Sequence, residues 1–129
     1  MKKIFTPLLL SAVFLLSSFK TGQGIDEVVG ALRSGNATEL ARYFDDTVEL
    51  TLPEKSDSYS KAQAQVIVKD FFSNNGVKGF ELKHKGTSPG GNFAIGTLQT
   101  SAGNFRTNIF MRNRNGKDVV KEIRFQSID

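Results

Sequence analysis

The stretch from Ser60 to Gly76 (SKAQAQVIVKDFFSNNG) constrains the fold most, because it predicts one amphipathic helix with both ends marked. Ser60 followed by Gln63 is a capping-box pattern, in which each side chain satisfies a backbone N–H that the first turn leaves unpaired. Gly76 can take the left-handed conformation that ends a helix. Apolar residues recur at every third or fourth position, so they form one stripe that a sheet must cover. The stripe consists of Ala64, Ile67, Val68, Phe71 and Phe72.

The chain after Gly76 changes to a period of two, which predicts that sheet. In its first strand Phe80, Leu82 and His84 share one face, and charged residues occupy the other. The strand from residue 93 carries apolar residues on both faces, so alternation leaves its inward face open. We expect strands over residues 80–85, 93–100, 105–113 and 117–128, with residues 86–92 as a loop.

The side chains of the last hairpin predict the register in which its two strands pair. A three-residue loop, Arg114-Asn115-Gly116, pairs Phe110 with Val120 on the outer face. A two-residue Asn115-Gly116 loop would instead set Ile109 opposite Glu122 on the buried face, so we expect the longer loop. The residues that then point inward are Phe105, Thr107, Ile109, Met111, Val119, Lys121, Ile123 and Phe125.

The chain before the central helix predicts two short helices and a strand. Apolar spacing favours a helix over residues 25–35 and a second one that Asn36 opens and Asp45-Asp46 ends. Residues 47–52 alternate as a half-buried strand, and a short second strand is expected near residues 57–59. Helices followed by a run of antiparallel strands make an α+β plan.

Two segments sharpen this plan. ALRSGNATELARYFDDTVEL (31–50) and SYSKAQAQVIVKDFF (58–72) resemble the opening and the central helix of nuclear transport factor 2-like domains. The resemblance implies a cone-shaped, cystatin-like fold, in which three helices from the N-terminal half pack on a curved antiparallel sheet. It also implies a cavity between the central helix and the sheet. The superfamily includes isomerases, dehydratases, ligand binders and dimerisation modules, so the fold does not select a function.

The first 24 residues have the layout of a secretory signal peptide. Lys2 and Lys3 precede an apolar run over residues 4–19, and Gly22-Gln23-Gly24 offers small residues before a cut. The alternative is an uncleaved anchor, but the run is shorter than the roughly 20 residues that span a membrane. We therefore expect one domain over residues 25–129, exported to the periplasm or beyond, with no stable membrane insertion after cleavage.

Charge and cysteine content exclude several classes of function. Of the 17 Lys and Arg residues three lie in residues 1–24, which leaves 14 against 13 Asp and Glu in the domain. A nearly neutral domain lacks the electrostatic footprint of a nucleic-acid-binding protein. With no cysteine and one histidine, the chain has neither a thiol nucleophile nor the usual ligand set of a metal site. We expect no metal and no cofactor.

A few side chains could give the cone its chemistry. An ammonium at Lys121, on a face otherwise apolar, must be paired, reach solvent at the sheet end or contact a ligand. His84 contacts a ligand inside the cone or lies solvated at its rim. Tyr43 and Tyr59 line the mouth or serve as amphipathic packing. The candidate ligand-binding residues are Lys121, Thr107, His84, Tyr43, Tyr59 and Met111.

The inward faces that can be assigned carry no carboxylate, so no catalytic acid–base pair is predicted. The leading hypothesis is a non-catalytic exported domain that binds a small, partly apolar or amphipathic ligand between helix 60–75 and the sheet. A second hypothesis is a homodimerising interaction module that uses the outer sheet face, where Phe110 and Val120 are expected. A third is an isomerase, dehydratase or hydrolase with an acid–base residue in the cavity.

Overall fold

A computed structural model describes residues 23–128, so residues 1–22 of the predicted signal peptide lie outside the described residues. None of the described helices is long and apolar enough to cross a membrane. The helices are α2 (Gln23–Ser34), α3 (Ala37–Ala41) and α4 (Lys61–Asn75). The strands are β1 (Phe44–Leu52), β2 (Lys55–Ser60), β3 (Val77–Ser88), β4 (Gly91–Thr100), β5 (Gly103–Arg114) and β6 (Lys117–Ser127).

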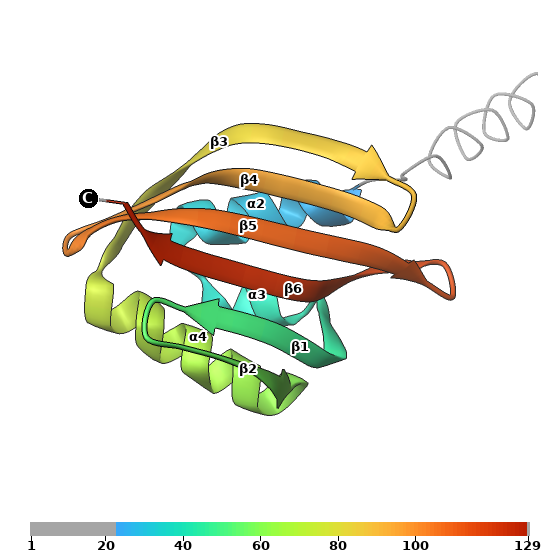
Figure 1. Ribbon diagram of the computed structural model, residues 1–129, viewed down its shortest axis with the longest axis horizontal. Coiled ribbons are helices and arrows are strands. Elements are labelled where there is room, and N and C mark those ends of the chain that lie inside the picture. Colours follow the sequence, from blue (N-terminus) through green and yellow to red (C-terminus); the bar gives the residue numbers. More distant parts are fainter. Residues whose placement is uncertain (1–22, 129) are drawn as a thin grey trace, which may run out of the picture.

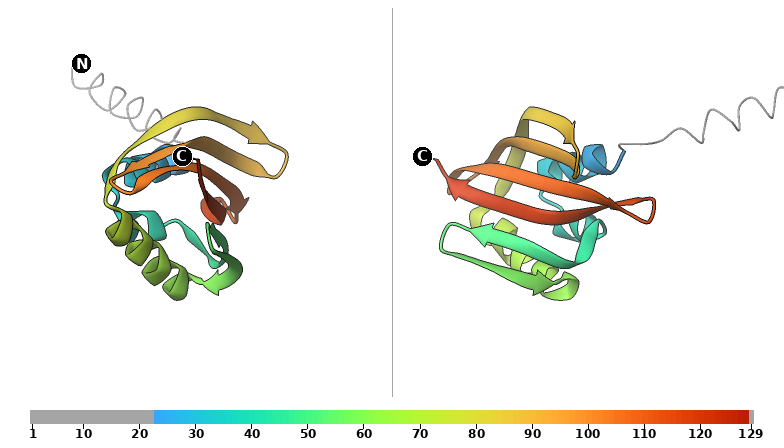
Figure 2. Two further views of the ribbon diagram at one scale, coloured as in Figure 1. Left: turned by 60° about the vertical axis from the view of Figure 1, so that its left-hand side comes forward. Right: turned by 45° about the vertical axis from the view of Figure 1, so that its right-hand side comes forward.

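The six strands form one curved sheet in the order β2-β1-β6-β5-β4-β3 (Figure 1). All three helices lie on its concave side, where α2 packs against β3 and β4, and α4 packs against α3, β1 and β2 (Figure 2). The predicted α+β cone is therefore confirmed. One feature differs from an antiparallel sheet: β1 runs parallel to β6, with Leu50 opposite Ile123.

The central helix has both predicted ends. The N–H of Gln63 donates to Ser60 Oγ over 3.2 Å, and the Gln63 amide oxygen accepts from the Ser60 N–H, which completes the capping box. Gly76 has φ +73° at the C-terminal cap. Of the predicted apolar stripe, Ala64, Val68 and Phe72 are buried, whereas Ile67 and Phe71 are half-buried at the edge of the core.

Four phenylalanines fill the space between α4 and the sheet. Phe71 lies against Phe105 and Phe125, with ring centroids 5.1 and 4.8 Å apart. Phe72 meets Phe125 edge-on at 6.1 Å. Phe72, Phe105 and Phe125 are buried. Edge-to-face and tilted pairs at these separations are favourable contacts, so this part of the cone is a packed core.

The predicted register of the last hairpin is wrong. Arg114 pairs with Lys117 around the two-residue turn that was rejected, and Asn115 and Gly116 have φ of +55° and +84°. Both residues have the positive φ of a type I′ turn, which suits the twist of a hairpin.

A β-bulge at Lys121 allows this shorter turn. Met111 pairs with Val120 and Phe110 with Glu122, so Lys121 has no partner on β5. Ile109 then lies opposite Ile123 and not opposite Glu122. The two-residue loop therefore does not place a charged residue on the buried face. The two-residue turn pairs Val120 with the buried Met111, so Val120 is fully buried in the core and not on the outer face as predicted.

A second bulge displaces His84 from its predicted face. Leu82 pairs with Gly96 and His84 with Ile95, which leaves Lys83 as an extra residue on β3. His84 is consequently exposed and lies 5.3 Å from the Phe93 ring, measured between centroids. It does not share the buried face of Phe80.

Three other local predictions need correction or completion. Asp45-Asp46 does not end a helix, because β1 already begins at Phe44. The expected loop over 86–92 is mostly strand, since β3 and β4 extend to a tight turn at Pro89-Gly90. The open question for β4 resolves in favour of Ala94 and Leu98, which are buried.

Candidate functional site

The six predicted ligand-binding residues do not converge on one site. Thr107 and Met111 are fully buried, and the Thr107 hydroxyl donates to the Phe105 carbonyl over 3.3 Å. The other four lie apart on the surface or at its edge: His84 on β3, Tyr59 on β2, Tyr43 before β1 and Lys121 on β6. Of these four, Tyr43 and Lys121 lie near one another, because the N–H of Val120, next to Lys121, donates to the Tyr43 carbonyl over 2.6 Å.

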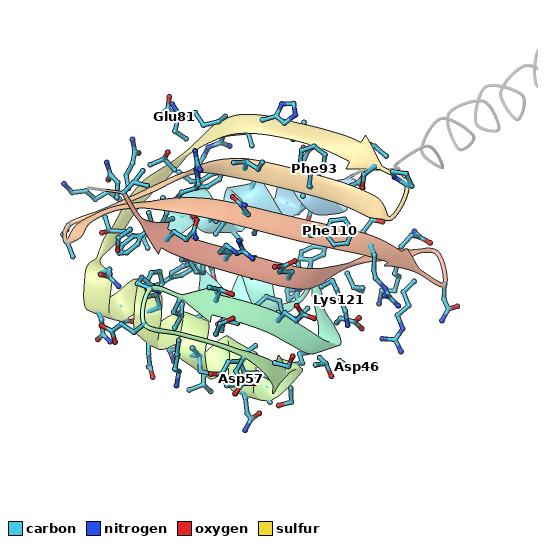
Figure 3. The ribbon with its side chains drawn as sticks, viewed as in Figure 1. Asp46, Asp57, Glu81, Phe93, Phe110 and Lys121 are labelled. Carbon is cyan, nitrogen blue, oxygen red and sulfur yellow. The ribbon has the colours of Figure 1, made fainter. Side chains whose placement is uncertain are left out.

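Lys121 belongs to an ion-pair network around a buried carboxylate. Asp45 is 5% exposed, Arg114 donates to its Oδ1, and Lys121 Nζ lies 3.9 Å from its Oδ2. Arg114 also reaches Asp46 at 3.4 Å, and Asp46 and Lys121 lie at the same end of the sheet (Figure 3). Burial raises the pKa of Asp45, but hydrogen bonds from the Asp46 N–H and from Arg114 outweigh it and hold that pKa below its usual value.

This network borders an open, polar groove at the end of the molecule where the β5–β6 hairpin turns. The groove has a volume of about 1040 Å³ and is lined by residues of both signs, among them Arg42, Lys61, Asp46, Lys117 and Asp118. Most of its polar groups already bond to one another: Asn92 and Asn113, for example, each donate to Asp118. We call it the hairpin groove.

A second groove lies at the opposite end, between the C-terminal half of α4 and the sheet. Its volume is about 580 Å³, which is within the range of small-molecule sites. We call it the helix-end groove. It is lined by Leu52, Pro53, Glu54, Lys55, Ile67, Asp70, Phe71, Asn74, Asn75, Phe105 and Ser127.

Four segments that are distant in sequence form the helix-end groove. The β1–β2 turn, the last turns of α4 and the ends of β5 and β6 meet at one end of the molecule (Figure 1). Its floor is apolar, with Phe71 and Ile67 half-buried and Phe105 buried. Its rim is polar and exposed, with the carboxylates of Glu54 and Asp70 and the amide of Asn74. An apolar floor with a polar rim can hold an amphipathic molecule.

The outer sheet face carries a small apolar patch. Phe93 pairs with Phe110 and Ile95 with Asn108 across β4 and β5, and all four are half-buried. Phe93 and Phe110 lie side by side on this face (Figure 3). A hollow of about 300 Å³ lies between these side chains. The buried Asn108 Oδ1 has no hydrogen-bond partner among residues 23–128. We call these four residues the outer-face patch.

Sequence reasoning missed the polar rim of the helix-end groove, although it placed Phe71 and Phe105 on inward faces. Glu54 and Lys55 read as a polar turn and Asp70 as the solvated side of a helix. No local pattern shows that a turn at residue 54 lies beside the start of a strand at residue 105. In the part of the chain that the structure describes, no three His, Asp or Glu side chains come together as a metal site.

Comparison with known proteins places the chain in a family. A family model described as a domain of unknown function, DUF4783, matches residues 25–126. A DUF4783 protein from Bacteroides uniformis is 38% identical, with a TM-score of 0.77 over 81% of this chain and 96% of that one. Another from Bacteroides ovatus is 34% identical, with a TM-score of 0.77 over 80% and 94%.

More distant structures agree in fold. An NTF2-like protein of unknown function from Burkholderia xenovorans is 16% identical, with a TM-score of 0.63 over 83% of each chain. No functionally curated protein matches. The chain belongs to the DUF4783 family of unknown function, and its domain has the NTF2-like fold.

Proposed function

We propose that this domain is an exported, non-catalytic binding protein that holds a small amphipathic molecule in the helix-end groove. One observation carries the proposal: a groove of about 580 Å³ joins the aromatic core to solvent, with an apolar floor and a polar rim. The positively charged start and apolar run of residues 1–24 support export to the periplasm or beyond.

The packed core explains why the ligand site lies at the mouth of the cone and not deeper. Phe71 and Phe105 are at once the inner wall of the groove and part of the aromatic cluster around Phe125. A ligand that covers the half-exposed Phe71 ring and Ile67 removes apolar surface from water without displacing the core. Apolar contact of this kind contributes about 25 cal/mol per Å² of buried area before the costs of association.

A pair of tryptophan variants tests this site. Asn74 lines the groove, whereas Ser73, its neighbour on α4, is exposed and does not. We expect Asn74→Trp to fill the groove and to weaken binding of a neutral amphipathic probe, 4-phenylbutanol, at least tenfold. Ser73→Trp is the matched control and should bind the probe as the unaltered protein does. Equal affinity in both variants would show that the probe binds elsewhere or not at all.

The outer-face patch favours a second candidate function, a homodimerising interaction module. Its specific support is Asn108 Oδ1, a buried acceptor without a partner among the described residues, in a side chain that lines the same hollow as Phe93 and Phe110. Such a group costs about 1–3 kcal/mol unless something donates to it. Sedimentation equilibrium tests this candidate. A dimer that Phe110→Glu dissociates supports it, and a monomer at the highest soluble concentration contradicts it.

A further inference from the structure

We infer that the helix-end groove selects an amphipathic molecule with a cationic head group, such as an organic ammonium ion. This inference rests on the proposed function and adds the chemical class of the ligand. Three features of the groove point to a cation: two unpaired carboxylates on the rim, the negative end of a helix, and an aromatic floor.

The carboxylates are those of Glu54, on the β1–β2 turn, and Asp70, on α4. Both line the groove, and neither forms an ion pair with any residue among 23–128. Elsewhere on the same domain exposed carboxylates do have cationic partners: Lys85 Nζ lies 2.6 Å from Asp26 Oδ1, for example. The rim therefore presents two negative charges, from the β1–β2 turn and from α4, without an ion-pair partner among residues 23–128.

The end of α4 adds to this negative potential. The helix has 15 residues and no basic residue in its last turn. Phe71, Asn74 and Asn75 of that end line the groove. The C-terminal end of a helix carries a partial negative charge, which stabilises a nearby cation.

Some of the carbonyl groups at the end of α4 already accept hydrogen bonds within the domain. The Gly76 N–H and the Asn75 side-chain amide donate to the carbonyls of Phe72 and Phe71 over 2.9 and 2.8 Å. Asn74 lines the groove, and no described residue donates a hydrogen bond to its carbonyl. That carbonyl remains free to accept a hydrogen bond from a ligand N–H.

The aromatic floor of the groove and the position of Lys55 also favour a cationic ligand. Phe71 and Phe105 offer aromatic rings to a cation or to an apolar chain. Among residues 23–128, Lys55 is the only basic residue that lines the groove, and its Nζ lies 5.9 Å from the centroid of the Tyr59 ring. With Lys55 held over Tyr59, the lining carries a net negative charge. A carboxylate ligand would meet like charges, and an ammonium ligand would meet opposite ones.

Three probes of matched shape test the inference: 4-phenylbutylammonium, neutral 4-phenylbutanol and 4-phenylbutanoate, each titrated into the protein at low salt. Two exposed charge contacts and a helix end together predict that the ammonium binds about tenfold more tightly than the alcohol. The carboxylate should bind more weakly than the alcohol. High salt should remove most of the difference between the probes, because exposed charge contacts are screened.

Variants assign the preference to the rim. The double variant Glu54→Gln/Asp70→Asn should lose most of the preference for the ammonium over the alcohol. Asp57→Asn is the matched control, because Asp57 is an exposed carboxylate on β2 that does not line the groove. It should keep the tenfold preference. If the alcohol binds as tightly as the ammonium to the unaltered protein, the charge class is wrong and the groove remains a binding site. If none of the three probes binds, the proposed function fails as well.

Discussion

Truncation of Phe125 to alanine should open a cavity in the aromatic core and destabilise the domain. Phe125 is fully buried, with the ring centroid of Phe71 at 4.8 Å and that of Phe72 at 6.1 Å. A buried Phe→Ala change costs about 3–5 kcal/mol of unfolding free energy. The loss of two aromatic contacts at these distances favours a value of about 4 kcal/mol. Urea unfolding should show this as a midpoint lowered by about 2 M with the slope unchanged.

Benzene gives the same variant a second, independent measurement. An apolar cavity stays dry and binds benzene, and a ligand that binds only the folded state stabilises it. Benzene should therefore raise the urea midpoint of Phe125→Ala by more than that of the unaltered protein, which lacks the new cavity. Phe125→Leu keeps most of the volume and should lose less than half as much stability. A loss below about 1.5 kcal/mol without a benzene effect would refute a core packed around this ring.

Two further predictions concern the ends of the molecule. Ser60→Ala removes the hydroxyl of the capping box and should cost about 1 kcal/mol in urea unfolding, whereas Ser58→Ala on the exposed β2 should cost under about 0.5 kcal/mol. Equal losses would contradict the capping role. The pKa of Asp45 is lowered in the folded state, so its stabilising contribution is complete above the unfolded pKa of about 3.9 and is lost as the pH falls through the lower folded value. Thermal melting below about pH 4 should depend less on pH in Asp45→Asn than in the unaltered protein, and the same pH dependence in both would contradict this assignment.

The elements that local chemistry determines were predictable. The ends of α4 follow from Ser60, Gln63 and Gly76, each of which acts within one or two turns of the helix. The left-handed Gly35 after α2 and the Asn36 cap of α3 are local in the same way: the Glu39 N–H donates to Asn36 Oδ1 over 3.0 Å. Patterns of this kind need no knowledge of the rest of the fold.

The bulges were not predictable from alternation, and they caused the main errors. One extra residue, at Lys83 or at Lys121, shifts every later side chain of the strand to the other face. His84 therefore reaches the outer face. Val120 precedes the bulge on β6 and reaches the core because the two-residue turn pairs it with the buried Met111. The sequence marks neither bulge with a glycine or a proline, so a strict period of two was the natural reading.

The candidate site was the least predictable part. Asp45 meets Arg114 across 69 residues, and the helix-end groove joins residues near 54, 71 and 105. Only the order of strands in the sheet brings these segments together. The parallel β1–β6 pair is the decisive contact, because it places the β1–β2 turn beside the C-terminal end of α4 and of β6.

Binding in the helix-end groove is tested most directly by amide chemical-shift mapping of the ¹⁵N-labelled protein with 4-phenylbutylammonium. Saturable shifts are predicted at Leu52, Phe71, Asn75 and Phe105, where the groove meets the aromatic core. The outer-face patch should show none at Phe110. Saturable shifts confined to the outer-face patch or to the hairpin groove, or no shifts at all, would contradict binding in the helix-end groove.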